Sequence, residues 1–414
     1  MEIIFGILIG LFVLMLLVVV HEFGHFIMAR KSGVEVKEFA ICFPPRAIAW
    51  QKIDGKWRKL KRSEWEKPPG KGTVVSLNWL PIGGFCQMKG DGDADPVPHG
   101  FGRASFWGKT KILFGGIVAN LIIAAGILTV LAWTGMPHFI PGQFHIPSDT
   151  NISAAPVIIG TIEPDSPAQK AGLMPNDQIK TLQIQKCVAE DCLPVVDETV
   201  QVITPQDITN FNSKFADQQI KLTFIRDNRE EQTLIQLNPA GGDYILGITM
   251  NQASQPLYRS TWSAPIVGVA TTAQLTGETF RSVGEMIGNL IGGVAMQVNF
   301  DNTVREEGAA HIEKAGQSVS GPVGIVGIIF PAFAQSGLTN LAFLAAIISI
   351  SLACMNILPI PALDGGRWLL IAFYRLRNKK LTREVEEKIV SRAFLVLIGL
   401  IILITVLDIT RFFK

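Results

Sequence analysis

The sequence is short of charge. Charged residues make up 17% of its 414 positions and hydrophobic residues 48%, which is too apolar for a soluble protein of this length. The formal net charge is only +2, and no glycine-rich phosphate loop or stripe of basic and aromatic residues is present. We therefore expect no nucleic-acid partner, and the composition predicts a protein whose surroundings are a lipid bilayer.

Cysteine is also scarce. The five cysteines are too few and too scattered for a disulfide scaffold or a CxxC zinc module, so any metal must be held by other ligands. Cys187 and Cys192 are separated by four residues. In an oxidising compartment this pair could form a disulfide, and two free thiols fit the sequence as well.

Long apolar runs predict four membrane spans. They cover residues 3–20, 112–133, 338–358 and 394–407. The first run has no basic residue before it and no small-x-small cleavage site after it, which argues against a cleaved signal peptide. A further apolar region at 264–298 is interrupted by Glu278, Arg281 and Glu285 at helical spacing. This region predicts an amphipathic helix on the membrane surface.

The charges between the spans predict their orientation. Residues 30–111 contain 16 Lys/Arg against 8 Asp/Glu, and residues 364–392 contain 8 against 4. Both segments are predicted to be cytoplasmic by the positive-inside rule. Residues 134–336 have the opposite bias, 11 against 20, and are predicted to lie outside the cytoplasm.

A metal-binding pattern ends the first span. His21-Glu22-Phe23-Gly24-His25 reads H-E-x-x-H, and on a helix the i, i+4 spacing places both imidazoles on one face with Glu22 beside them. Ionisable groups are costly at membrane depth and usually face a cavity with a function. The pattern predicts a hydrolytic zinc site at the cytoplasmic end of the span.

A catalytic zinc usually takes three protein ligands, so a third must come from elsewhere in the chain. Near the end of the third span the chain reads N-I-L-P-I-P-A-L-D-G-G-R from Asn356 to Arg367. Two prolines break the helix there, and two glycines permit close backbone approach. Asp364, a carboxylate at membrane depth, is the predicted third ligand.

H-E-x-x-H in a first span, together with N-x-x-P-x-P-x-L-D-G-G in a late one, resembles the site-2 protease family of intramembrane metalloproteases. The resemblance implies Zn²⁺ held by His21, His25 and Asp364, with Glu22 as the general base. It also implies that Asn356 lies near the backbone of the substrate.

Two further elements resemble those of the family. The segment from Gly115 to Asn120 is similar to a family element in which proline is common where this chain has Ile117. Asn120 is therefore either an active-site residue or a polar contact between helices. The segment containing Gly83, Gly84 and Phe85 resembles a membrane-associated β-hairpin that is thought to pair with unwound substrate as an added strand.

The polar region after the second span resembles a PDZ domain. Gly160 to Leu173, followed by Asn176-Asp177-Gln178-Ile179, matches the PDZ signature of bacterial membrane and periplasmic proteases. Such a domain could bind a peptide by strand addition, or it could act as a size filter that excludes bulky substrates. The sequence does not separate these two roles.

We therefore predict a polytopic α-helical membrane protein with cytoplasmic membrane-associated β-hairpins and one extracytoplasmic α+β PDZ-like domain. The predicted parts are 1–134 with two spans, 150–251 as the PDZ-like domain, 252–336 as a connector with the amphipathic helix, and 337–414 with two further spans. By resemblance, this would be a zinc metalloendopeptidase of the bacterial inner membrane. Its substrates would be single-span membrane proteins such as anti-sigma factors or signal-peptide remnants, usually cut once beforehand.

Two other functional classes, an inactive scaffold and a transporter, fit the sequence less well than a protease. An inactive scaffold of the same fold should have lost one of the four predicted catalytic residues, and all four are present. A transporter with an intramembrane metal site fits less well, because the chain has no visible repeat and carries a glutamate between its two histidines.

Overall fold

The computed structural model describes residues 2–90, 92, 97–140, 142–153, 155–188, 191–241, 244–252, 256–297, 301–317, 321–379 and 381–412. It divides into two compact units, one formed by 1–132 and 264–414 and the other by 133–263. The side chains of Cys187 and Cys192 lie outside the described residues, so the question of their disulfide stays open.

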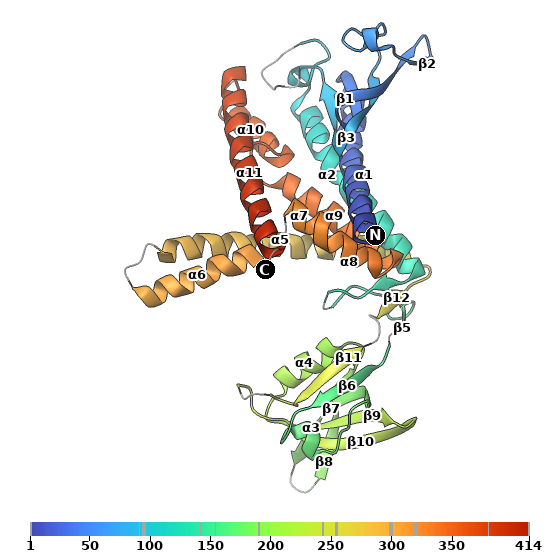
Figure 1. The fold of residues 1–414 in the computed structure, drawn as a ribbon, viewed down its shortest axis with the longest axis vertical. Helices are drawn as coiled ribbons and strands as arrows, with labels where there is room; N and C mark the ends of the chain where they lie inside the picture. The colour runs from blue at the N-terminus through green and yellow to red at the C-terminus, as the bar shows by residue number, and fades with distance from the viewer. Residues whose placement is uncertain are drawn as a thin grey trace. The chain divides into compact units, whose positions relative to one another are not determined.

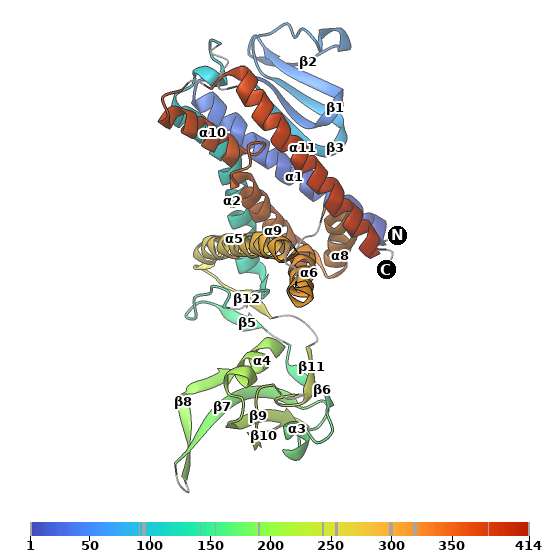
Figure 2. The same ribbon diagram turned by 90° about the vertical axis from the view of Figure 1, so that its left-hand side faces the viewer.

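Four apolar helices form the framework of the first unit (Figures 1 and 2). They are α1 (Glu2–Lys31), α2 (Phe106–Thr134), α9 (Leu338–Ile357) and α11 (Arg383–Phe412). Within the described part of the chain, these are the four helices long and apolar enough to cross a membrane. The four predicted spans are therefore confirmed as helices, and the chain is compatible with a multi-pass membrane protein.

A small sheet accompanies α1. It has the order β2-β1-β3, formed by β1 (Val36–Ile53), β2 (Lys56–Lys59) and β3 (Val74–Met88). The turn between β1 and β2 has positive φ at both Asp54 and Gly55, as a two-residue hairpin turn requires. The chain reverses at the β-hairpin predicted around Gly83 and Gly84, although β3 is continuous. Residues 74–77 lie opposite residues 38–41 of β1 in ascending order, whereas residues 84–88 lie opposite residues 36–41 in descending order, so the two arms flank the beginning of β1 and do not pair with each other. The first arm of β3 also pairs with residues 46–51 at the end of β1.

The remaining helices of this unit are shorter or amphipathic. They are η1 (Arg62–Glu64), η2 (Phe101–Arg103), α5 (Ala264–Gln297), α6 (Asn302–Gln317), α7 (Pro322–Gly324), the π-helix η3 (Ile325–Ile329), α8 (Phe330–Gln335) and α10 (Asp364–Leu376). The helix predicted at 264–298 is confirmed as α5, which packs beside α6 as a helical hairpin (Figure 1). Two glycines permit this packing, because a Cβ on Gly293 would lie 2.8 Å from the carbonyl oxygen of Gly308.

The second unit is α+β. One sheet has the order β10-β9-β7-β6-β11, with β8 paired to β7, and another has the order β4-β12-β5. The strands are β4 (Met136–Pro137), β5 (Asn151–Ser153), β6 (Val157–Ile162), β7 (Gln178–Val188), β8 (Asp191–Gln201), β9 (Gln219–Arg226), β10 (Arg229–Gln236), β11 (Ile248–Gln252) and β12 (Leu257–Arg259), and the helices are α3 (Pro167–Lys170) and α4 (Pro205–Lys214). Apolar residues from the larger sheet and from both helices form one core, which includes Ile159, Leu182, Ile208 and Leu222.

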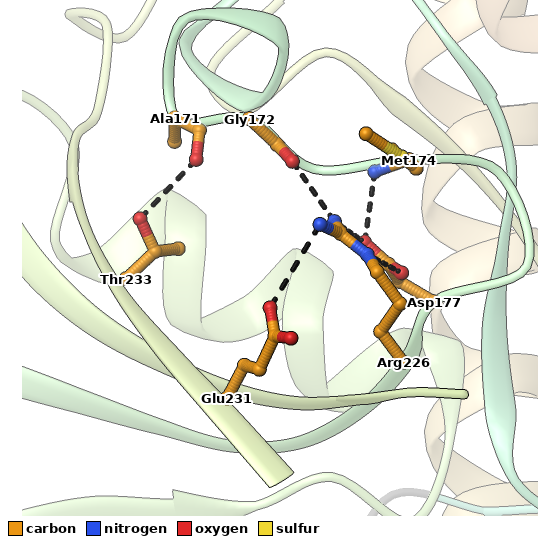
Figure 3. Close-up of polar contacts among 7 residues, drawn as sticks. All are labelled: Ala171, Gly172, Met174, Asp177, Arg226, Glu231 and Thr233. Atoms are coloured by element: carbon orange, nitrogen blue, oxygen red, sulfur yellow. Dashed lines mark hydrogen bonds and ion pairs between the residues drawn. The ribbon is translucent and has the colours of Figure 1, made fainter. Parts of the chain in front are cut away.

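A buried ion pair fastens the turn before β7 to β9 (Figure 3). Asp177 is 1% exposed, and its two carboxylate oxygens accept hydrogen bonds of 2.8 and 2.6 Å from Arg226. The same carboxylate accepts a bond from the backbone N–H of Met174, and Arg226 also donates to the carbonyl of Gly172. A carboxylate can be buried in this way because each of its oxygens is paired.

Candidate metal centre

The two histidines of the H-E-x-x-H pattern lie on one face of α1, as their spacing predicts. Their Nε2 atoms are 3.1 Å apart, and the residues are 8% and 6% exposed. His25 Nδ1 lies 2.8 Å from the carbonyl oxygen of Ile112 in α2. Because a carbonyl only accepts, Nδ1 carries the proton, and the lone pair of His25 Nε2 therefore points at His21.

The third predicted residue joins them. Asp364 Oδ2 lies 3.1 Å from His21 Nε2 and 3.3 Å from His25 Nε2. Asp364 is the first residue of α10, where the chain folds back after α9. The two glycines that follow make this turn possible, because a Cβ on Gly365 would lie 2.1 Å from the carbonyl oxygen of Ile357. A Cβ on Gly366 would lie 2.0 Å from the carbonyl oxygen of Ile360.

The donor set fits a zinc ion. Zinc–nitrogen and zinc–oxygen bonds of about 2.0–2.2 Å at tetrahedral angles require ligand atoms roughly 3.3–3.6 Å apart. The three ligand atoms of His21, His25 and Asp364 are separated by 3.1–3.3 Å, close to this range. The lone pair of His25 faces a carboxylate oxygen, an arrangement that is repulsive unless a cation or a proton lies between them. The second nitrogen of His21, Nδ1, is buried without a hydrogen-bond partner among the described residues.

Three glycines bring α2 against this centre. A Cβ on Gly24 would lie 2.2 Å from the carbonyl oxygen of Gly115, so α1 and α2 touch at the backbone. A Cβ on Gly116 would lie 2.6 Å from His21 Cε1 and 2.7 Å from His25 Nε2. No role was predicted for these glycines from the sequence. Their signal was present as Gly24 inside the metal pattern and as the Gly115-Gly116 pair in a span.

Glu22 lies at the edge of the centre. It is only partly buried, and its carboxylate accepts a hydrogen bond from the backbone N–H of Cys86 in the second arm of β3. The carboxylate is close enough to His21, His25 and Asp364 to interact with them electrostatically. This arrangement places a carboxylate beside the three candidate ligand atoms and connects it to the sheet.

The other residues predicted for the site have different surroundings. Asn120 is 0% exposed, and neither atom of its side-chain amide has a hydrogen-bond partner among the described residues, whereas its backbone carbonyl accepts a bond from Ser349. The described contacts therefore give no support for its amide as a polar contact between helices. Asn356 is half-buried in the last turn of α9.

Gly83, Gly84 and Phe85 lie where β3 passes α1. A Cβ on Gly83 would lie 3.0 Å from the ring of Phe43, and a Cβ on Gly84 would lie 2.7 Å from the carbonyl oxygen of Ala40. Gly83 also has φ of +153°, which favours glycine. The ring of Phe85 stacks on that of Phe43 with centroids 6.2 Å apart.

A pocket of about 450 Å³ borders Asp364. Its lining includes Pro361, Arg367 and, from α11, Glu386 and Ser391. Arg367 and the buried Glu386 form an ion pair of 3.6 Å that joins α10 to α11. Asp364 therefore borders an open space lined by α10 and α11.

Comparison with known proteins agrees with this centre. The family model described as "Peptidase family M50" matches residues 9–60 and 64–401. A protein of Nostoc sp. named "Putative zinc metalloprotease" is 29% identical over 412 residues, covering 98% of this chain and 96% of that protein. A protein of the same name from Clostridium acetobutylicum is 26% identical over 407 residues, covering 98% and 97%. "Zinc metalloprotease RasP" of Bacillus licheniformis is 24% identical over 479 residues, covering 96% and 97%.

Proposed function

Because this chain belongs to peptidase family M50, the site-2 protease family of zinc metalloproteases, we propose that it cuts single-span membrane proteins within or near their membrane span. In this proposal His21, His25 and Asp364 hold the Zn²⁺ and Glu22 is the general base. The single observation that supports these roles best is the convergence of three ligand atoms within 3.1–3.3 Å beside a glutamate.

The chemistry would be peptide-bond hydrolysis. A bound zinc ion supplies a Lewis acid that polarises the scissile carbonyl and lowers the pKa of water to about 7. Glu22 accepts the proton of the attacking water and passes it to the leaving amine. The backbone bond from Cys86 holds the Glu22 carboxylate in position for both transfers.

A substrate helix must unwind before it is cut, because its peptide bonds are shielded and already hydrogen-bonded. The segment Gly83 to Phe85 would receive the unwound peptide as an added strand. The second arm of β3 also carries Cys86, whose backbone N–H bonds the carboxylate of Glu22. A peptide strand paired with this arm would therefore run past Glu22. Asn356 and the unpartnered amide of Asn120 would bind the peptide backbone.

We assign the protein to the bacterial inner membrane, with the metal centre near the cytoplasmic side and unit 133–263 outside the cytoplasm. The basic segments after the first and third spans support this orientation. Anti-sigma factors and signal-peptide remnants that have already been cut once are the proposed substrates.

The test is cleavage of a tagged single-span substrate by purified protein in detergent, with bound zinc measured for each variant. Glu22→Gln should keep zinc and lose cleavage, whereas Asp364→Asn should lose both. Glu285→Gln, an exposed carboxylate on α5, is the matched control and should behave as wild type. Cleavage by Glu22→Gln at the wild-type rate would refute the role of Glu22.

A second proposed function concerns unit 133–263, which we assign as a PDZ-like domain that binds the carboxyl end of a peptide. A groove of about 370 Å³ lies between α4 and the segment leading into β11, an edge strand of its sheet. Its lining includes Thr209, Asn212 and Ser213 from α4. The side-chain oxygen of Asn212 is buried without a partner among the described residues.

The backbone at one end of this groove has the polarity that a carboxylate needs. The four carbonyls from Tyr244 to Gly247 each accept a hydrogen bond from within the unit, from Asn238, Ala168 or Glu163. Among the described residues, the N–H groups of the same four residues have no backbone acceptor outside the strands. A loop whose carbonyls are turned inward, and whose N–H groups have no such acceptor in the described part of the chain, favours an anion.

A binding experiment can distinguish peptide binding from size filtering as the role of this domain. A fluorescent peptide with a free carboxyl end should bind the full chain, and its amidated form should bind more weakly. Ser213→Arg, inside the groove, should abolish binding, whereas Asn210→Arg on another face of α4 should not. Equal binding of the acid and amide forms would leave the size filter as the better assignment.

A further inference from the structure

The outer part of the small sheet has one face that combines aromatic and basic side chains. Trp50 lies opposite Lys59 and Lys52 lies opposite Trp57 in the antiparallel pairing of β1 with β2. Directly opposed residues point to the same side of a sheet, so these four side chains share one face, here termed the distal face. Trp57 is 62% exposed, and both lysines are exposed.

The other side of the same strands is covered. Ala49 packs with Leu60 and Val74 in a small core, and the amide of Gln51 donates to the carbonyls of Gly70 and Gly72. The loop after β2 therefore lies over that side and leaves the distal face open. Neither Lys52 nor Lys59 has an ion-pair partner among the described residues.

Below the distal face the same side of the sheet is apolar. Trp50 pairs with Val75 and Ile48 with Leu77, and burial alternates along β3 so that Leu77 and Trp79 are 37% and 70% exposed. Along the sheet the apolar residues are therefore followed by two levels, each of which holds one tryptophan and one lysine. An apolar surface that ends in a mixed set of tryptophan and lysine side chains is found where a protein passes from the acyl chains to the head groups of a bilayer.

The height of the distal face along the sheet agrees with a position at the level of the head groups. At the lower end of the sheet a Cβ on Gly83 would lie 3.5 Å from a methyl of Val18 and 3.0 Å from the ring of Phe43. From Val18 to Lys31, the last residue of α1, the helix rises by roughly 20 Å at 1.5 Å per residue. From Arg46 to Lys52, β1 rises by roughly 20 Å at about 3.3 Å per residue. The lysines of the distal face therefore lie near the level of the basic end of α1.

We propose that the distal face binds the head groups of anionic phospholipids. Lys52 and Lys59 would contact the phosphates, and Trp50 and Trp57 would lie at the boundary with the acyl chains. A lipid surface fits better than a soluble acidic protein, because the tryptophans continue a side of the sheet on which Leu77 and Trp79 are apolar and exposed. This contact would hold the sheet, and with it the strand beside Glu22, at a fixed depth.

The experiment is hydrogen–deuterium exchange of the full chain in lipid nanodiscs, made from phosphatidylcholine alone or with added phosphatidylglycerol. In wild type the amides of residues 50–59 should exchange more slowly when phosphatidylglycerol is present, by up to roughly 30-fold for two lysines near an anionic surface. High salt should remove the difference. Lys52→Gln with Lys59→Gln should abolish it.

The matched control is Lys56→Gln with Lys71→Gln, which removes the same charge from exposed positions outside the distal face and should keep the lipid effect. Unchanged exchange in β9 and β10 would verify that each variant is folded. The proposal is overturned if wild type ignores phosphatidylglycerol or if both double variants lose the effect equally. Protection that appears only when a protein substrate is added would overturn it in favour of a polypeptide partner. Zinc content does not enter this test, so its result is independent of the protease assignment.

Discussion

Replacing Gly116 with alanine should empty the metal centre while leaving the helices folded. The added Cβ would lie 2.6 Å from His21 Cε1 and 2.7 Å from His25 Nε2, where carbon contacts normally begin at about 3.5 Å. Relief of this overlap requires both rings or the backbone of α2 to move by roughly 1 Å. The imidazoles are tightly held, because His25 is bonded to Ile112 and α1 touches α2 at Gly24.

The expected loss of zinc affinity follows from the small displacement that zinc ligands tolerate. Ligand distances must stay within about 0.2 Å of their ideal values, and even outer residues that orient a ligand change affinity by about 10–100-fold. We therefore expect zinc affinity to fall by roughly 100-fold or more. The helix itself should not suffer, because alanine is favoured over glycine in a helix interior by about 1 kcal/mol.

The assay is zinc content after dialysis against a competing chelator, together with helicity and thermal unfolding in detergent. Gly126→Ala is the control, because it lies on the same helix and its Cβ would meet nothing within 4 Å. Wild-type zinc affinity in Gly116→Ala would refute the role of this glycine. A variant that retains normal helicity but has no zinc would support it.

Further predictions concern other contacts. Asp177→Asn should lower the free energy of unfolding of unit 133–263 by about 2–3 kcal/mol, because it breaks a buried pair with the partly exposed Arg226 (Figure 3). Glu231→Gln, which removes the exposed partner of the same arginine, should cost less than about 0.5 kcal/mol. A thermal or proteolytic unfolding assay measures both. Asp149 has a pKa that burial alone would raise, but hydrogen bonds from Ser263 and Thr261 lower it from 3.8 to about 2. Its stabilising contribution should be complete above pH 3.8 and lost as pH falls towards 2, and unfolding curves of Asp149→Asn should lack this component. Gly24→Ala should separate α1 from α2 and reduce both zinc content and thermal stability, since its Cβ would lie 2.2 Å from a backbone oxygen.

The spans and the three residues that converge at the candidate metal centre were predictable from sequence, because their signals are local or strongly constrained by chemistry. A helix in a bilayer must be long and apolar, so composition within a window is sufficient to find it. Two histidines at i, i+4 share a helix face by geometry alone. Asp364 was found because a carboxylate followed by two glycines, after two prolines, has few other uses at membrane depth.

The course of β3 could not be read from the chain. Pro81-Ile82-Gly83-Gly84 has the composition of a turn, and a hairpin was the natural prediction. The chain does reverse there, but the two arms do not pair with each other, because the beginning of β1 lies between them. Local composition cannot reveal which distant segment will complete a backbone ladder, so register was decided by the tertiary structure.

The sequence by itself determined which residues can bind zinc and which segments can cross a membrane, because both depend on side-chain chemistry and on periods of a few residues. Only the tertiary structure decided that Asp364 reaches the histidines, that Gly116 clears space for their rings, and that Trp50 and Trp57 share an open face with two lysines. These facts depend on contacts between segments as much as 343 positions apart, which are set by the packing of the whole unit.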